Sequence, residues 1–291
     1  NTPAGEAFDV LLIAGIVVSG FGLASVYAAP LTKTLIDTWN IQTAVMVLGI
    51  TFLAIVTVLA QFLKAPPTGY LPAGAPAPKA AAIGDRKTDF APREMLGTAQ
   101  FYLLWFMYAC GAGAGLMVIG KLAIIAKVQA GIDLGFLLVA VLAIGNGAER
   151  IVAGTLSDKI GRKATLFMCF VVQAVLVLVL SQTVEGGTLA QAPILALVSA
   201  LIGANYGANL SLFPSVTKDY YGLKNFGVNY GLVFTAWGVG GFMLAFLAGR
   251  LYDVYQTFNF AYYGASVLLI LAAIVTVFVK APHRTQTATQ A

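Results

Sequence analysis

Charged residues are scarce in this sequence: only 10% of its 291 residues are Asp, Glu, Lys or Arg, whereas 59% are apolar. A soluble domain carries roughly 25% charged residues, so this chain cannot cover a water-exposed surface with polar groups. A soluble globular domain is therefore excluded, and lipid must be the solvent for much of the chain. The formal net charge of +5 is attributed to basic cytoplasmic loops rather than to a surface for nucleic acid.

Side chains suited to metal binding or nucleophilic catalysis are also few. The one histidine, His283, lies in the carboxy-terminal tail, where we expect it to be solvated. The two cysteines, Cys110 and Cys169, fall inside apolar runs and are interpreted as small packing residues. The sequence shows no metal-ligand cluster, phosphate-binding loop or nucleophile beside a base. We therefore expect no enzyme activity, no metal and no cofactor.

Long apolar runs are what the sequence does have. About 20 apolar residues cross a bilayer as a helix, and lipid cannot satisfy the polar backbone of any open structure. The pattern predicts an all-α polytopic membrane protein with eight transmembrane helices, at residues 10–30, 43–63, 101–126, 134–153, 164–183, 193–215, 227–249 and 258–279.

One connection between the predicted spans is long and contains six prolines, which is typical of a linker between two bundles. It divides the chain into 1–64 with two spans, the linker 65–100, and 101–291 with six spans. Twelve of the 17 Lys and Arg residues lie on one set of connections and four on the other. The richer side is predicted to be cytoplasmic. We expect a multi-pass protein of the inner (plasma) membrane with both termini in the cytoplasm.

The fourth predicted span carries an arginine among polar neighbours. Arg150 and Asn146 are four residues apart and share one helical face, whereas Glu149 points about 100° away from Arg150. An arginine at the bilayer centre costs about 2.5–3.5 kcal/mol, so an interaction must offset it. A substrate carboxylate matches the guanidinium with two charge-assisted hydrogen bonds. The alternative is a structural ion pair with Glu149 or with an acid on another helix.

The sixth and seventh predicted spans supply further candidate ligands. The hydroxyl group of Tyr206 can bond a carboxylate while its ring lines a cavity, and Asn209 lies near it on the same helix. Phe234 and Trp237 can form an apolar wall around a small substrate. Ordinary helix packing is the alternative for Asn209, Phe234 and Trp237. The fifth and eighth spans, with little polarity beyond Gln173 and Thr276, are predicted to be lipid-facing supports.

The connection after the fourth span reads Gly154-Thr-Leu-Ser-Asp158-Lys-Ile-Gly161-Arg162-Lys. Gly154 allows a close approach and Gly161 a tight turn, while Asp158 and Arg162 can form a charge latch between helix ends. Such a gating loop would stabilise one access state; the alternative is an ordinary basic loop. The stretch resembles the G-x-L-[SA]-D-[KR]-x-G-R-[KR] signature of the major facilitator superfamily.

The resemblance implies a place for each span. In that family the signature follows the second and eighth of twelve spans, and a linker separates the sixth from the seventh. The eight spans then correspond to spans five to twelve, which implies a major facilitator fold lacking its first four helices. An amino-terminally incomplete sequence is expected, with a naturally deleted form as the alternative.

Several stretches also resemble the oxalate/formate antiporter family and related monocarboxylate transporters: Gly20-Phe-Gly-Leu-Ala-Ser-Val-Tyr27, Asn146-Gly-Ala-Glu-Arg150-Ile, Phe213-Pro-Ser-Val-Thr-Lys-Asp-Tyr-Tyr-Gly222 and Asn229-Tyr-Gly231. The resemblance implies that Arg150 anchors a carboxylate and that Tyr206 and Phe234 occupy aromatic cavity positions. Trp237 stands where oxalate exchangers carry a lysine, which favours a monocarboxylate. Glu149 stands where a small residue is common, so it is a candidate proton acceptor or a tolerated partner of another cation.

We therefore expect a secondary active transporter of small carboxylates that works by alternating access. The first choice is symport of a proton with a monocarboxylate of the lactate, pyruvate or formate class. Carboxylate exchange is the second, and a membrane sensor that binds a carboxylate without moving it is an alternative of another class. The expected partners are a small carboxylate anion, a proton and the lipid bilayer, with no nucleic acid.

Overall fold

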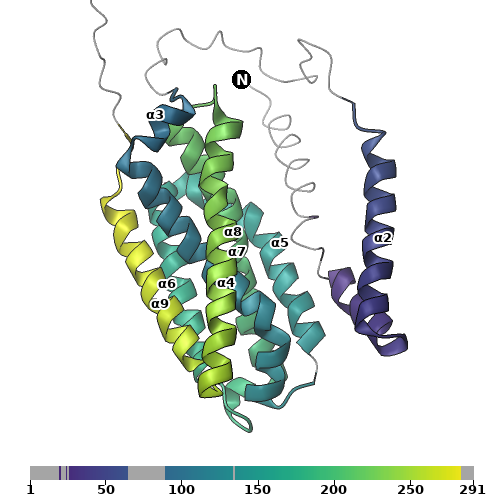
Figure 1. The fold of residues 1–291 in the computed structure, drawn as a ribbon. Coiled ribbons are helices and arrows are strands. Elements are labelled where there is room, and N and C mark those ends of the chain that lie inside the picture. Colours follow the sequence, from purple (N-terminus) through teal and green to yellow (C-terminus); the bar gives the residue numbers. More distant parts are fainter. Residues whose placement is uncertain (1–19, 21–23, 25, 65–88, 134, 283–291) are drawn as a thin grey trace, which may run out of the picture.

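The computed structural model describes residues 20, 24, 26–64, 89–133 and 135–282, without the side chains of Arg150 and Ile151. Every regular element in this part of the chain is helical (Figure 1). Most of the first predicted span, 10–30, lies outside the described residues, as do 65–88 of the linker and His283. The predicted all-α fold is confirmed for the described part of the chain.

Seven described helices are long and apolar enough to cross a membrane. They are α2 (Ile41–Ala60), α4 (Ala99–Ala130), α5 (Gly135–Ile160), α6 (Arg162–Ser181), α7 (Ala192–Tyr221), α8 (Phe226–Tyr255) and α9 (Asn259–Phe278). They correspond to the second to eighth predicted spans. The helix α5 ends at Ile160 rather than at 153, and α7 at Tyr221 rather than at 215. Counting apolar residues locates the edge of the hydrocarbon, whereas the helical backbone continues into the polar region.

The helices α4 to α9 pack into one bundle, in which α5 contacts α7, α4 contacts α8, and α6 contacts α9 most extensively. Glycines bring two of these pairs together. A side chain added at Gly145 or Gly203 would clash with the backbone of the partner helix, so α5 and α7 touch backbone to backbone. Gly240 lies equally close to the backbone of Ala109, which joins α8 to α4. Small residues at such crossings are the usual means of close packing in membranes.

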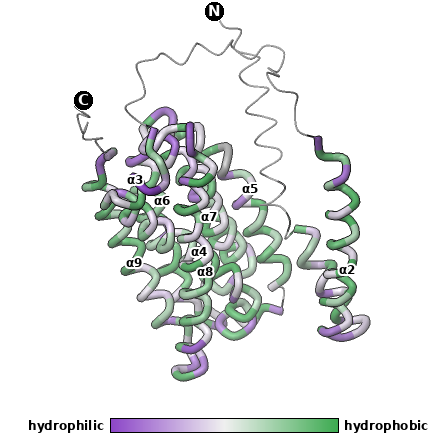
Figure 2. Tube along the Cα trace, turned by 45° about the horizontal axis from the view of Figure 1, so that its top comes forward, coloured by the Kyte–Doolittle hydropathy of each residue, from purple (hydrophilic) through white to green (hydrophobic). Residues whose placement is uncertain are grey.

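The helix α2 stands apart from this bundle (Figure 1). Ala44 is its one buried residue, and large apolar side chains such as Ile50 and Leu53 are exposed. Figure 2 shows that α2 is hydrophobic along most of its length. Apolar residues on all sides suit a helix that meets lipid or other membrane helices rather than water.

The last residues of the predicted linker belong to the bundle. Phe90 is buried, its backbone N–H donates to the carbonyl of Tyr221, and its carbonyl accepts from the side chains of Asn225 and Asn229. The short helix α3 (Pro92–Leu96) follows and buries Met95. The segment from Phe90 to α3 therefore fastens the start of α4 to the turn between α7 and α8.

Gln173 of α6 and Thr276 of α9 point inward. Gln173 is only 2% exposed and Thr276 only 1%, and the hydroxyl group of Thr276 donates to the carbonyl of Ala272. The opposite sides of these helices carry exposed apolar side chains such as Val175 and Ile274. Only one side of each helix is thus suited to lipid, because a polar group in hydrocarbon is costly without a partner.

Candidate functional site

The predicted carboxylate anchor lies on α5. The backbone of Arg150 belongs to this helix, and its side chain lies outside the described residues. Asn146, four residues earlier, is buried, and its Oδ1 atom has no hydrogen-bond partner among the described residues. A Cβ added at Gly207 of α7 would touch Asn146, so the asparagine lies at the α5–α7 contact. A buried amide oxygen of this kind has the capacity to bind a further donor.

Glu149 follows Asn146 by three residues on α5, and its side chain is half-buried. Among the described residues it has no ion pair. Because the side chain of Arg150 lies outside the described residues, the suggested ion pair of Arg150 with Glu149 stays a prediction, as does the proton role of Glu149.

Three of the predicted ligands come together from α7 and α8. The indole N–H of Trp237 donates to the hydroxyl group of Tyr206 over 2.8 Å, and the ring of Phe234 stacks on Trp237 with centroids 5.3 Å apart. Tyr206 is buried, whereas the two α8 side chains are half-buried. The ring of Tyr206 lies against Gly115 of α4, where an added Cβ would meet it at 2.6 Å, whereas the next residue, Gly207, faces Asn146 of α5.

The aromatic group extends beyond the residues that the sequence suggested. Phe226 stacks on Tyr230 with centroids 5.7 Å apart, and Tyr230 lies against Phe234 at 5.6 Å. Tyr108 of α4 reaches the same group, with its hydroxyl group 3.5 Å from that of Tyr230. The α8 residues recur every three or four positions, which is the spacing of one helical face and was readable from the sequence. Tyr108 carries no such local signal.

Asn209 lies in a packed interface. A Cβ added at Gly111 of α4 would meet the Oδ1 atom of Asn209 at 2.6 Å and the ring of Phe170 at 2.8 Å. The side-chain amide of Asn209 donates to the carbonyl of Asn205 within α7. This position between α4 and α6 supports the packing alternative for Asn209.

The predicted gating loop is almost entirely helical, which corrects the sequence prediction. The helix α5 runs to Ile160 and α6 begins at Arg162, so Gly161 alone separates them. Gly161 has φ +90° and ψ 153°, a conformation that is essentially restricted to glycine. Gly154 lies inside α5, and a Cβ added there meets no described atom within 4 Å. The close approach expected at Gly154 is therefore absent from the described part of the chain.

The charge latch predicted for this region involves three helices. Arg162 at the start of α6 pairs with Asp158 of α5 over 2.7 Å and with Asp219 of α7 over 3.3 Å. It also donates to the hydroxyl group of Ser157 over 2.7 Å. Asp219 was not found from the sequence, because it follows Arg162 by more than fifty residues and only the packing of α6 on α7 brings the two together.

Seven described apolar helices of spanning length define a polytopic membrane protein. Two overlapping segments, residues 9–181 and 125–291, match the Major Facilitator Superfamily. Together they cover nearly the whole chain. The chain belongs to this superfamily, as the signature around Gly161 predicted.

Curated relatives include transporters of small carboxylates. The chain is 28% identical over 232 residues to the oxalate:formate antiporter of Oxalobacter formigenes, covering 77% of this chain and 51% of the relative. It is 26% identical over 235 residues to the uncharacterized MFS-type transporter YhjX of Escherichia coli K12, covering 79% and 54%. Human monocarboxylate transporter 14 is 27% identical over 143 residues, covering 48% and 26%. The chain spans about half the length of the first two relatives.

Proposed function

We propose that this protein is a secondary active transporter of small carboxylates, and that it carries monocarboxylates together with protons. The six-helix bundle 101–291 would rock against a bundle to which 1–64 contributes, with the linker 65–100 between them. The substrate would bind midway through the bilayer, at the interface between the bundles. We further propose the inner (plasma) membrane as its location, with both ends of the chain in the cytoplasm.

The observation that carries this proposal is the aromatic group of Tyr206, Trp237 and Phe234 between α7 and α8, with a buried amide oxygen of Asn146, which has no described partner, on the adjacent helix α5. In the proposed site Arg150 supplies the charge, one helical turn after Asn146. Asn146 supplies a side-chain amide, and the ring of Phe234 forms an apolar wall that excludes water. A polar centre beside aromatic rings is the general design of a small-molecule site.

The substrate class follows from the charges of this site. We assign one cation, Arg150, to the substrate, and one guanidinium balances one carboxylate. Trp237 occupies the position of the second cation of oxalate exchangers, and in this structure its N–H is used by Tyr206. A monocarboxylate of the lactate, pyruvate or formate class is therefore favoured over a dianion.

Glu149 is the proposed proton carrier. It is half-buried on α5, next in sequence to Arg150, and has no ion pair among the described residues. A carboxylate in that setting can be protonated on one side of the membrane and released on the other. Carboxylate exchange without a proton is the second candidate, favoured by the similarity to the oxalate:formate antiporter.

The latch of Asp158, Arg162 and Asp219 is proposed to stabilise one access state. It joins the ends of α5, α6 and α7, so these ends must keep their positions while the three side chains are paired. Gly161 would act as the turn that sets the angle between α5 and α6. Loss of the ion pairs of Arg162 with Asp158 and Asp219 would shift the equilibrium between access states, because contacts made in only one state stabilise that state.

Transport in proteoliposomes tests the proposal. Uptake of labelled lactate, pyruvate, formate and oxalate is measured with and without an inward proton gradient, for the wild type, Arg150→Lys and Glu149→Gln. We expect gradient-driven uptake of a monocarboxylate, a loss of at least about tenfold in Arg150→Lys because a lysine cannot form the bidentate pair, and loss of the gradient dependence in Glu149→Gln.

Each alternative has its own signature in this assay. Oxalate carried best, in exchange for an internal carboxylate and without a gradient effect, would establish the second candidate and overturn the argument from Trp237. Uptake unchanged in Arg150→Lys would make the arginine structural. Trp237→Lys is the matched specificity variant, because it adds a second cation and should raise the relative uptake of oxalate.

A further inference from the structure

A cationic pocket lies at the end of the bundle that carries the charge latch, away from the proposed substrate site. Its volume is about 580 Å³, and it lies where α4, α6, α7 and the residues after α9 meet. Apolar side chains form its inner part: Leu104, Met107, Leu166 and Val216. Three cations also line it, namely Arg162, Lys163 and Lys280.

The two lysines are the groups available to an anion. Arg162 is already paired with Asp158 and Asp219. Lys163 is exposed, and its ammonium group donates to the carbonyl of Val277, which leaves two of its three N–H donors. Lys280 is exposed and has no ion pair with a described residue. No acid is among the residues that line the pocket.

The depth of these lysines in the membrane follows from the lengths of α6 and α9. Each helix has 20 residues, which is about 30 Å and equals the hydrocarbon thickness of a bilayer. Lys163 is the second residue of α6, and Lys280 follows the end of α9 by two residues. Both ammonium groups therefore lie at the level of the lipid headgroups.

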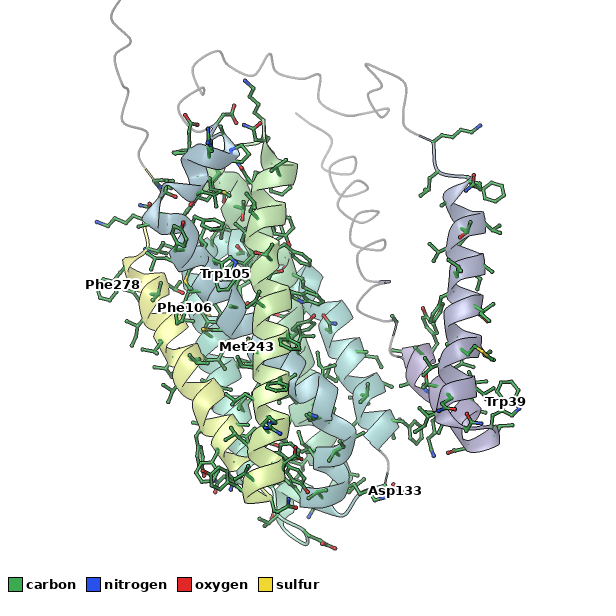
Figure 3. All side chains as sticks on the ribbon, in the orientation of Figure 1. Trp39, Trp105, Phe106, Asp133, Met243 and Phe278 are labelled. Carbon is green, nitrogen blue, oxygen red and sulfur yellow. The ribbon has the colours of Figure 1, made fainter. Side chains whose placement is uncertain are left out.

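The surface beside the lysines is apolar and exposed. Phe167 lies one turn after Lys163 on α6. Phe278 is the last residue of α9, and Ile274 lies one turn before it; all three side chains are exposed. Figure 3 shows Phe278 at the outer edge of the bundle, at the end of α9. An amphiphile with an anionic headgroup suits this surface, because its headgroup can pair with the lysines and its chains can cover the exposed apolar side chains.

We infer that this pocket is a binding site for an anionic phospholipid. The phosphate lies between the ammonium groups of Lys163 and Lys280 at the rim of the pocket, and the acyl chains cover the outer face of α6 and α9. Basic pockets between membrane helices bind anionic headgroups in this way. The inference does not depend on the proposed transport function.

Native mass spectrometry of the purified 291-residue protein tests the inference. The protein is exchanged into detergent with phosphatidylglycerol or phosphatidylcholine of the same chain length, and retained lipid is counted. For Lys163→Gln/Lys280→Gln we expect about a tenfold loss of phosphatidylglycerol binding, because each lysine near the headgroups contributes on the order of a few-fold or more to anionic lipid binding. Phosphatidylcholine binding should not change.

The matched control is Lys64→Gln/Lys224→Gln, which removes the same charge from exposed lysines that do not line the pocket. Retention of phosphatidylglycerol at the wild-type level in this control supports a local site. Equal loss in both double variants overturns the inference in favour of general charge attraction. Equal wild-type retention of the two lipids also overturns it. Displacement of phosphatidylglycerol by millimolar glycerol phosphate alone would identify a soluble phosphate as the ligand and overturn the lipid assignment.

Discussion

Two helix pairs of the same bundle are held together in different ways. The helices α5 and α7 touch backbone to backbone at Gly145, Gly203 and Gly207. The helices α6 and α9 also pack along their length, though less extensively, but α6 contains no glycine, and Gly264 of α9 has no described neighbour within 4 Å of an added Cβ. Side chains join this second pair, with two hydrogen bonds: from Ser266 to the carbonyl of Ala174 and from Lys163 to the carbonyl of Val277.

The difference follows from what each pair carries. The first pair holds Asn146, Glu149, Arg150 and Tyr206, and a backbone contact fixes the rotation and depth of these side chains relative to one another. The second pair holds large apolar side chains on its outer side, and side-chain packing tolerates small shifts. Glycine contacts thus occur where polar groups must be positioned, and ordinary packing occurs where a helix mainly separates the bundle from lipid.

The largest expected effect is at the glycine contact itself. Gly203→Val places a branched side chain against the carbonyl of Leu142, so α5 and α7 must separate. We expect a loss of about 3 kcal/mol in the free energy of unfolding, at the upper end of overpacking effects. The thermal midpoint in detergent reports it. Gly264→Ala on α9 is the control and should be neutral or stabilising by up to about 1 kcal/mol. Similar losses in both variants would end the distinction between the pairs.

The turn that connects the two pairs comes next. Gly161→Ala forces a side chain into the conformation at φ +90° and should cost about 1–3 kcal/mol. Gly154→Ala, seven residues earlier and inside α5, should stabilise the helix by up to about 1 kcal/mol. The same thermal assay compares them. A stable Gly161→Ala variant would show that the α5–α6 connection can adopt another turn.

Each helix pair contains a buried side-chain amide, and replacing each amide tests which pair binds the substrate. Gln173 of α6 and Asn146 of α5 both have polar atoms without a described partner. Replacing either by Leu should change the free energy of unfolding by about 1 kcal/mol in the stabilising direction, because an unpaired buried group is removed. Uptake of monocarboxylate should survive in Gln173→Leu and be lost in Asn146→Leu. Loss of uptake in both would give α6 a role in binding.

The smallest effect is expected at the charge latch. Arg162 is 26% exposed and its partners Asp158 and Asp219 are 68% and 41% exposed, so solvent screens both pairs. Arg162→Gln should cost about 1 kcal/mol at low salt and less in 1 M salt. Thermal midpoints at the two salt concentrations measure this. Lys218→Gln at the same end is the control, because its nearest acid is 4.0 Å away. A salt-independent loss would contradict the electrostatic account.

Much of the fold was predictable because the bilayer imposes strict rules. Each span from the second to the eighth was located from its apolar run, since lipid admits only helices of about 20 residues. The ends of α5 and α7 were missed because hydrophobicity does not report on the polar flanks. The signature around Gly161 identified the superfamily, although the stretch forms two helix ends rather than a loop.

The candidate site was only partly predictable. Tyr206, Phe234 and Trp237 were singled out by residue type and by their position within spans, and the structure brings them together. Tyr108 and Asp219 were missed, because their partners lie on other helices, far away in sequence.

Asn209 was predicted as a ligand from its residue type and its place near Tyr206 on the same helix, yet it faces Gly111 in a packed interface. Residue type alone does not distinguish a cavity from a contact.

The solvent, the helical fold, the number and order of the described spans and the superfamily all follow from the amino-acid sequence. These depend on composition and on the spacing of residues along one helix, which are local properties. By contrast, the packed bundle was needed to show which glycines touch a backbone, which acid pairs with Arg162, and which rings surround Tyr206. Contacts between helices depend on the rotation and depth of each helix, and these are set by packing of the whole bundle rather than by any single segment.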